Sequence, residues 1–269
     1  FMKDKVVVIT GGSSGIGKAL AVKFGMEGSK IVISGRNMEK LLEVEKELKA
    51  QQIQVVSVTA NSASEVDNGI LINRAYKEFG GIDVLICNAG ISMRALFQDV
   101  DLNVLKQVMD INFWGTVYAC KFALPHLIKS KGSIVGISSI AGEKGLPGRT
   151  GYSSSKFAMQ GFLESLRIEL LKKGVHVLVA CPGFTSSNIR NTALTATGMV
   201  QGESPLDEGK IMSAEEVANY IYNAVKTRKR DLVLTTQGKL TVLLNKFFPA
   251  FMDKMVLKHF AKEEGSPLK

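Results

Sequence analysis

The sequence has little cysteine, proline, histidine and tryptophan, and it has no long uninterrupted apolar run. Its 269 residues include 3 Cys, 6 Pro, 3 His and 1 Trp. The cysteines are odd in number, lie far apart in apolar segments and lack metal-ligand spacing, so we expect buried free thiols and no bound metal. No stretch approaches the ~18 consecutive apolar residues of a transmembrane helix.

Acidic residues are also in the minority. Lys and Arg total 34 against 25 Asp and Glu, a net charge of +9. Because the basic residues are dispersed, and the run at 226–230 is typical of a solvated helix end, we do not expect nucleic-acid binding. Val6 opens an apolar run shortly after Met2, which leaves no room for a signal peptide, and Phe1 before Met2 is interpreted as an expression scar. We therefore expect a cytoplasmic protein.

Short apolar, β-branched runs alternate with amphipathic helical patterns along the chain. The predicted strands are Val6–Thr10, Ile31–Ser34, Val55–Val58, Val84–Cys87, Ser133–Ile137, Val175–Ala180 and Leu232–Leu234. The predicted helices cover about 15–27, 37–51, 63–79, 101–129, 151–173 and 214–227. Because the runs show no alternation of polar and apolar residues, helices should cover both faces of the sheet. The pattern predicts an α/β fold with a Rossmann-type, doubly wound parallel sheet of about seven strands.

The chain reads as one catalytic domain followed by an apolar tail. The domain covers 2–235 and contains an irregular insertion at 184–212, which is long enough for a substrate loop. The extension at 236–269 carries apolar residues at helical spacing, interrupted by Pro249, which predicts two short helices. Three roles are open for the tail: a cover over the substrate pocket, a subunit interface, or a membrane-surface helix. We favour the interface, in a homodimer or homotetramer.

A glycine-rich turn joins the first strand to the first helix. Residues Thr10–Gly17 read TGGSSGIG, a G-x-x-x-G-x-G spacing. Glycines let the backbone come close to a phosphate, and the helix N-terminus offers N–H donors, so the turn predicts a dinucleotide site rather than an ordinary tight turn. The expected contacts are Gly11, Ser13, Ser14, Gly15, Ile16 and Gly17.

The residues at the end of the second strand indicate which nicotinamide cofactor binds. The segment Ser34-Gly35-Arg36-Asn37 has no carboxylate to bind a ribose 2′-hydroxyl, and Arg36 suits a 2′-phosphate. This favours NADP(H) over NAD(H), with Arg36 and Asn37 as cofactor contacts. The alternative is that Arg36 is a surface residue capping the next helix.

A serine, a tyrosine and a lysine form the predicted catalytic group. Ser139 precedes Tyr152-x-x-x-Lys156, so the tyrosine and the lysine share one helix face. A phenol with a pKa of about 10 is a poor acid/base at neutral pH, and a neighbouring ammonium can lower that pKa. Such a group can move a proton to or from a substrate oxygen.

Together these motifs resemble the short-chain dehydrogenase/reductase family over nearly the whole chain. The segment 138–152 and the tail are most similar to the hydroxysteroid and retinoid-type reductases. The resemblance implies that Ser139 orients the substrate oxygen, and that Lys156 also binds the nicotinamide ribose. It further implies that Asn112, in Asp110-Ile111-Asn112, holds a water in the proton relay. A structural amide that bends its helix is the alternative for Asn112.

The resemblance also implies further cofactor contacts. Asn61, beside Ser62, takes the place of the family's adenine-binding Asp, and Cys87 replaces the first residue of Asn-Asn-Ala-Gly. After the sixth strand, the carboxamide contact is either Thr185 or Ser187. The implied set is Asn61, Ser62, Asn88, Ala89, Gly90, Tyr152, Lys156, Pro182, Gly183 and Thr185.

The expected activity is hydride transfer between NADP(H) and a lipophilic ketone or aldehyde, with Tyr152 as acid/base. Arg94 and Arg149 are candidates for binding a charged substrate group. The expected pocket lining is Met93, Leu96, Phe97, Leu146, Phe184, Ile189, Leu194, Met199 and Val200. The alternatives are a regulator that binds the cofactor without chemistry and a protein that acts on a membrane surface through its tail.

Overall fold

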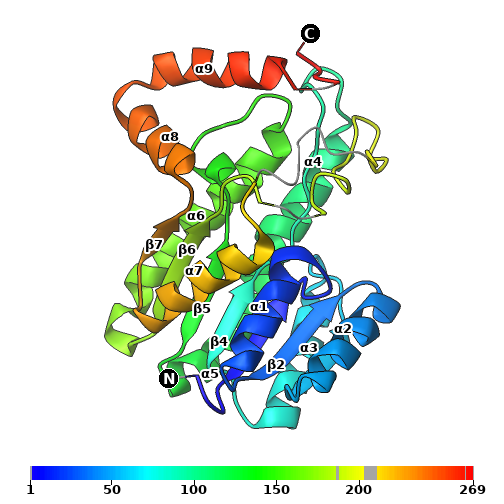
Figure 1. The fold of residues 1–269 in the computed structure, drawn as a ribbon, viewed down its shortest axis with the longest axis vertical. Helices are drawn as coiled ribbons and strands as arrows, with labels where there is room; N and C mark the ends of the chain where they lie inside the picture. Colours follow the sequence, from blue (N-terminus) through cyan, green and yellow to red (C-terminus); the bar gives the residue numbers. More distant parts are fainter. Residues whose placement is uncertain (1, 186–187, 203–210, 264, 269) are drawn as a thin grey trace.

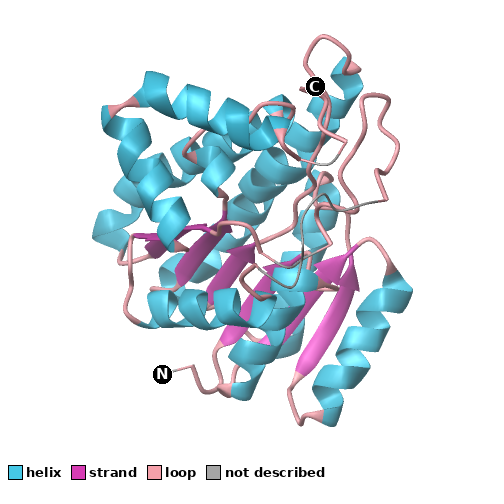
Figure 2. Cartoon of the chain, turned by 45° about the horizontal axis from the view of Figure 1, so that its top comes forward, coloured by secondary structure: helices cyan, strands magenta, loops and turns pink. Residues whose placement is uncertain are grey.

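A computed structural model of the chain describes residues 2–185, 188–202, 211–263 and 265–268. Its centre is a seven-stranded sheet in the order β3-β2-β1-β4-β5-β6-β7, and every neighbouring pair is parallel (Figures 1 and 2). The strands are β1 Val6–Thr10, β2 Lys30–Gly35, β3 Val55–Thr59, β4 Val84–Cys87, β5 Ser133–Ile137, β6 His176–Cys181 and β7 Asp231–Val233. The predicted doubly wound sheet is confirmed.

Helices cover both faces of this sheet. Core residues of α1, α2 and α7 pack on one face, and those of α3, α5 and α6 on the other. The helices are α1 Gly15–Met26, α2 Met38–Ala50, α3 Glu65–Phe79, α4 Leu102–Met109, α5 Gly115–Ser130, α6 Thr150–Leu170, α7 Ala214–Lys226, α8 Thr236–Phe247 and α9 Pro249–Ala261. The two layers give the sheet its apolar surroundings on both sides.

The central strands show why their sequences lack alternation. In β1, Val7 and Ile9 point into the core beneath α1, whereas Val8 points into the opposite core, and all three side chains are fully buried. Each face of the strand therefore has to be apolar. The carboxyl ends of all seven strands meet at one edge, where ligand sites form in such folds.

The predicted helix at 101–129 is interrupted. After α4, residues Asp110–Trp114 form a π-helical turn, and α5 begins at Gly115. A π turn accommodates one extra residue and rotates the side chains within it, and such turns are frequent at functional sites. Periodicity alone did not predict this break, because all three segments are apolar at nearly helical spacing.

The tail forms two short helices, as predicted, with Pro249 in the first turn of α9. In Figure 1, α8 and α9 lie across the end of the molecule opposite the N-terminus. Within the described residues, no helix combines the length and apolar character needed to cross a bilayer. The three cysteines are buried free thiols, as expected.

His176, at the start of β6, is a buried residue with a structural role. Its Nε2 lies 2.7 Å from the carbonyl oxygen of Lys229, and its Nδ1 lies 3.1 Å from Oγ of Ser133. These contacts fit a neutral ring that donates to Lys229 and accepts from Ser133. Burial lowers the pKa of His176, and the bond to Lys229 partly opposes that shift.

We predict that His176 makes stability fall in mild acid. Below the pKa of about 6.5 that His176 has in the unfolded chain, the unfolded chain binds a proton at this ring and the folded chain does not. The contribution of neutral His176 to the free energy of unfolding is therefore complete above that pH and is lost below it. The loss should reach at most about 1.4 kcal/mol for each pH unit. In urea unfolding, the difference in free energy of unfolding between wild type and His176→Gln should shrink as the pH falls from about 7.5 to about 5.5. His259→Gln, at an exposed site, should show no such trend.

Candidate active site

The glycine turn at the end of β1 has the shape of a phosphate cradle. Gly11 and Gly15 have positive φ angles of 67° and 50°. A Cβ added at Gly17 would lie 2.1 Å from the carbonyl oxygen of Gly11, so only glycine fits there. Helix α1 begins with no acidic residue in its first turn, and Ser14 at its N-cap makes no side-chain capping bond. The N-terminus therefore offers N–H donors suited to a pyrophosphate.

The other predicted contacts of this turn play supporting parts. The Ser13 hydroxyl lies against Gly35, where a Cβ would come within 3.3 Å of it. Ile16 packs on the core beneath α1. Ser13 thus lies close to the end of β2, and Ile16 anchors the first turn of α1.

Asn88 holds the glycine turn in place. Its Nδ2 donates to the carbonyl oxygens of Thr10 and Gly11, at 3.0 and 2.9 Å. The Thr10 hydroxyl oxygen in turn accepts from the backbone N–H groups of Asn88 and Ala89, both at 3.1 Å. Asn88 is therefore a positioning residue for the turn, a role that its place in a motif does not reveal.

A hollow of about 360 Å³ opens where β2 and β3 end. Arg36, Asn61, Lys106 and Asp110 are among its lining residues. Asn37, not Arg36, caps α2, because its Oδ1 accepts from the backbone N–H of Lys40 at 2.9 Å. The capping role considered for Arg36 is therefore wrong, and its exposed guanidinium is left facing the hollow.

Asn61 and Ser62 shape the same end of the site through their own backbone contacts. The Asn61 Oδ1 accepts from the N–H of Ala63 at 3.1 Å. The carbonyl oxygen of Ser62 accepts from Asn68 at 2.9 Å. Asn61 keeps its amide nitrogen for other contacts, since its oxygen already closes a turn.

Ser139, Tyr152 and Lys156 come together at the end of β5. Ser139 follows the strand, and its Oγ accepts from the N–H of Ala141 at 3.1 Å. Tyr152 lies in the first turn of α6, and the Lys156 Nζ is 5.7 Å from the centre of its ring. Lys156 is buried and donates to the carbonyl oxygen of Ile137 at 2.8 Å. The predicted spacing therefore does produce a cluster.

The pKa of Tyr152 does not fall as the sequence led us to expect. Burial raises the pKa of Tyr152, while the Ser139 hydroxyl and the charges of Arg149 and Arg190 oppose the rise without cancelling it. Burial also lowers the pKa of Lys156 to about 8. Lys156 is not among the groups that shift the pKa of Tyr152, and its Nζ donates to the carbonyl oxygen of Ile137. The phenol therefore stays protonated at neutral pH.

Asn112 lies inside the π turn and is fully buried. Its Nδ2 donates to the carbonyl oxygen of Ile91 and to Oγ of Ser155, both at 2.9 Å, and its Oδ1 accepts from the N–H of Ile91 at 2.8 Å. A Cβ at Gly90 would lie 3.2 Å from that Oδ1 and 3.5 Å from the Lys156 Nζ. Asn112 thus holds the loop after β4 against α6, and it also stands beside Lys156.

Cys87 explains how the family's asparagine can be missing. Its thiol is buried in the core, 4.0 Å from the sulfur of Cys120 on α5. The side chain at this position points into the helix layer, away from the glycine turn. A cysteine at this position therefore packs against α5, and it is also among the groups that raise the pKa of Lys156.

The segment after β6 closes the site on a third side. A Cβ at Gly183 would meet the Thr235 hydroxyl at 2.9 Å, and the Pro182 carbonyl oxygen accepts from the N–H of Ile140 at 3.3 Å. The buried Thr185 hydroxyl donates to the Gly183 carbonyl oxygen at 3.2 Å. Ser187, the alternative to Thr185, lies outside the described residues.

The expected pocket residues divide into two groups. Met93 and Leu194 form a β-bridge and belong to the apolar cluster that includes Tyr152. In contrast, Phe97, Met199 and Val200 are 63%, 70% and 61% exposed and line neither of the two hollows, so their role as pocket lining stays a prediction. They lie on exposed loops, where an apolar sequence gives no sign of direction. Leu96 and Ile189 are half-buried, and Phe184 stacks on His259 of α9.

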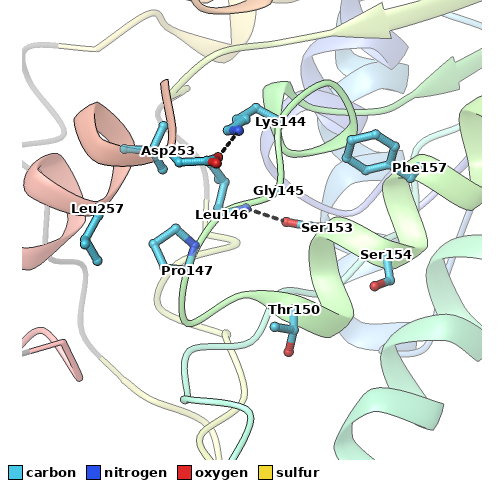
Figure 3. A pocket seen from close by; sticks show the side chains of 11 residues that line it. Lys144, Gly145, Leu146, Pro147, Thr150, Ser153, Ser154, Phe157, Asp253 and Leu257 are labelled. Carbon is cyan, nitrogen blue, oxygen red and sulfur yellow. Dashed lines mark hydrogen bonds and ion pairs between the residues drawn. The ribbon is translucent and has the colours of Figure 1, made fainter. Parts of the chain in front are cut away.

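A second hollow, of about 630 Å³, lies between α9 and the first turns of α6 (Figure 3). Leu146, Ser153, Phe157 and Leu257 are among its lining residues, and an ion pair of Lys144 with Asp253 spans it. Ser153 faces this hollow, whereas Tyr152 does not line it. The tail therefore flanks the helix that carries the tyrosine.

Arg94 and Arg149, the candidates for a charged substrate group, both contact Glu263 of the tail. This internal carboxylate was not foreseen, because the three residues are far apart in sequence. No local pattern signals such a pairing.

Comparisons with known proteins place these features in a family. The family model described as short chain dehydrogenase matches residues 5–197. Dehydrogenase/reductase SDR family member 7B of Mus musculus is 35% identical over 272 residues, which cover 99% of this chain and 84% of the mouse protein. Dehydrogenase/reductase SDR family protein 7-like of Drosophila melanogaster is 32% identical over 275 residues, covering 100% and 84%.

Two solved structures share the fold. A short chain dehydrogenase/reductase from Burkholderia phymatum in complex with NAD superposes with a TM-score of 0.82 at 24% identity, covering 93% of this chain and 95% of that one. An alcohol dehydrogenase from the archaeon Thermococcus sibiricus, complexed with 5-hydroxy-NADP, gives 0.76 at 22% identity, covering 86% and 95%. These two structures show the fold alone. The match to the family model and the matches along nearly the whole chain show that this chain belongs to the short-chain dehydrogenase family of oxidoreductases.

Proposed function

We propose that the protein is an NADP(H)-dependent carbonyl reductase that interconverts a lipophilic ketone or aldehyde with its alcohol. The observation that carries this proposal is the meeting of Ser139, Tyr152 and Lys156 beside the glycine turn. The apolar surroundings of Tyr152, formed by Met93, Leu194 and neighbours, favour a lipophilic substrate.

Each residue of the proposed site has its own role in the reaction. A bound nicotinamide supplies the hydride. Tyr152 gives its proton to the substrate oxygen as negative charge develops there, and Ser139 donates a hydrogen bond to the same oxygen. Burial raises the pKa of Tyr152, and the hydrogen bond with Ser139 opposes that rise, so Ser139 stabilises the phenolate that remains once the proton has been transferred. Lys156 contributes a buried cation close to the ring, and Asn112 fixes the loop beside it.

The preference for NADP(H) rests on Arg36. Its guanidinium faces the hollow at the ends of β2 and β3, and Asn37 has taken over the capping of α2. A guanidinium binds a phosphate through charge-assisted hydrogen bonds, whereas a ribose hydroxyl gains much less from it. Lys106 lines the same hollow and adds positive charge from α4.

We predict that Tyr152→Phe lowers kcat by at least about a hundredfold, because the proton donor is lost while the ring remains. NADPH binding, measured by fluorescence titration, should change little. Tyr220→Phe, at a tyrosine that is 50% exposed on α7, is the control and should keep full activity. A Tyr152→Phe enzyme with most of its kcat would refute the assignment, and a wild type that binds NADPH but reduces no carbonyl would favour a regulator.

We predict that Arg36→Asp shifts cofactor preference from NADPH toward NADH. The ratio of kcat/KM for the two cofactors should change by about tenfold or more, since a hydrogen bond to a charged group contributes about 1.5–3 kcal/mol. Lys40→Asp makes the same charge change on exposed surface one turn along α2, and it should leave the ratio alone. Equal ratios in both variants would remove Arg36 from the cofactor site.

We also propose that the tail forms a subunit interface in a cytoplasmic homodimer or homotetramer. Seven of its apolar side chains are between 49% and 64% exposed, and groups of exposed apolar residues are typical of interaction sites. These residues are Leu240, Leu243, Phe247, Phe248, Phe251, Met255 and Leu257. The three free thiols support a reducing compartment.

The double substitution Phe247→Asp with Phe251→Asp should lower the mass measured by light scattering, because it places charges on the proposed interface. Met26→Asp, at an apolar residue that is 65% exposed on α1, is the control and should keep the wild-type mass. An unchanged mass combined with lost liposome binding would assign the tail to a membrane surface. An unchanged mass with a raised KM for bulky carbonyls would assign it to the pocket.

A further inference from the structure

A carboxylate of the tail is buried against two arginines from the catalytic domain. Glu263 Oε2 lies 2.9 Å from Nη2 of Arg149 and 3.4 Å from Nη2 of Arg94, and its Oε1 lies 3.2 Å from the same Arg149 nitrogen. The three side chains are only 4%, 12% and 11% exposed, in that order. Charges at such burial are costly unless they are paired, so each member depends on the others.

Each arginine is adjacent in the chain to an element of the Tyr152 site. Arg149 is the N-cap of α6, one turn before Tyr152 on the same helix. Arg94 follows Met93, which packs in the same apolar cluster as Tyr152, and its N–H donates to the carbonyl oxygen of Leu194 at 2.8 Å. The charge of Arg149 acts on the Tyr152 phenol, and Arg94 is joined through Met93 to the apolar cluster against which Tyr152 packs.

The contact is fixed by the rest of the tail. The Arg149 guanidinium lies 4.5 Å from the centre of the Phe260 ring. The buried Ser266 hydroxyl donates to the carbonyl oxygen of Phe260 at 2.7 Å, which closes the chain around Glu263. A side chain at Gly148 would meet Pro267 at 3.3 Å. Several contacts thus hold the tail at this position, in addition to the ion pair.

The charges themselves call for an anion. Burial lowers the pKa of Arg94, the carboxylate of Glu263 raises it, and the charge of Arg149 lowers it again. Two guanidinium groups this close repel each other, and a carboxylate between them relieves the repulsion. Guanidinium groups are also the donors best matched to the two oxygens of a carboxylate.

We infer that Arg94 and Arg149 form a carboxylate-binding site beside Tyr152, and that Glu263 occupies it as an internal ligand. Glu263 is then a specificity-determining residue: while it fills the site, the enzyme takes uncharged carbonyl compounds and disfavours those that carry a carboxylate. The role in specificity rests on the function proposed above, whereas occupation of the site does not.

The first test uses acetate, because acetate is the fragment that Glu263→Ala removes. Millimolar acetate should raise the Tm of Glu263→Ala above that in chloride of equal ionic strength, and it should leave the wild type unchanged. Asp253→Ala is the matched control, since Asp253 is also a tail acid paired with a basic residue, Lys144, but its side chain is 69% exposed. No acetate effect on a folded Glu263→Ala protein would overturn the site.

The second test compares 4-formylbenzoate with its methyl ester as substrates. The wild type should prefer the ester, and Glu263→Ala should move the ratio of kcat/KM toward the acid by about tenfold or more, the magnitude of one charge-assisted hydrogen bond. Where Glu263→Ala does not fold, Glu263→Gln keeps the shape, removes the charge and should move the ratio in the same direction. A ratio unchanged in both variants would overturn the role in specificity. If neither compound reacts with any variant, the proposed function fails, while the acetate result still decides the site.

Discussion

The hydrogen bonds between Thr10 and Asn88 are the constraint on which the site depends. Together with the bond from Asn88 to Gly11 and the bond from Ala89 to Thr10, they join the ends of β1 and β4, adjacent strands of the sheet, through four contacts of about 3 Å. The Asn88 Nδ2 also lies where a Cβ at Gly11 or Gly17 would come within 3.1 or 2.5 Å of it, so a side chain at either position would collide. The glycine turn thus owes its shape to a side chain far along the chain as well as to its own glycines. Without that support, the flexible turn would lose entropy on binding a phosphate.

Tyr152 and Lys156 are connected to the same edge of the sheet through the loop after β4. The loop after β4 continues from Asn88 to Ile91, where Asn112 holds both backbone groups of Ile91 and reaches across to Ser155 on α6. The π turn is what directs Asn112 inward, so an irregularity in one helix fixes the position of another. Because Ser155 lies between Tyr152 and Lys156 in the same helix, the phosphate cradle and the proton donor form one connected framework.

The sequence predicted those features that depend on local pattern. Apolar β-branched runs predicted all seven strands, and the spacing of Tyr152 and Lys156 predicted their common helix face. It did not predict the π turn, since a single extra residue hardly alters periodicity, nor that Asn37 rather than Arg36 caps α2. The sequence also did not predict which way side chains point in loops, as the exposed Phe97 and Met199 show. The contact of Arg149 with Glu263 joins residues 114 positions apart, and no local signal reports such a pair.

The contact of Arg149 with Glu263 anchors the tail by charge in addition to apolar packing. A buried ion pair adds little net stability, because desolvation offsets most of the attraction, but it specifies geometry strictly. An apolar tail could slide along an apolar groove, whereas Glu263 has a single position between Arg94 and Arg149. The anchor lies one helical turn from Tyr152, so a displacement of the tail would separate Glu263 from the arginine at the start of the helix that carries the phenol. The tail therefore fixes the charge balance at the start of α6 as well as one wall of the neighbouring hollow.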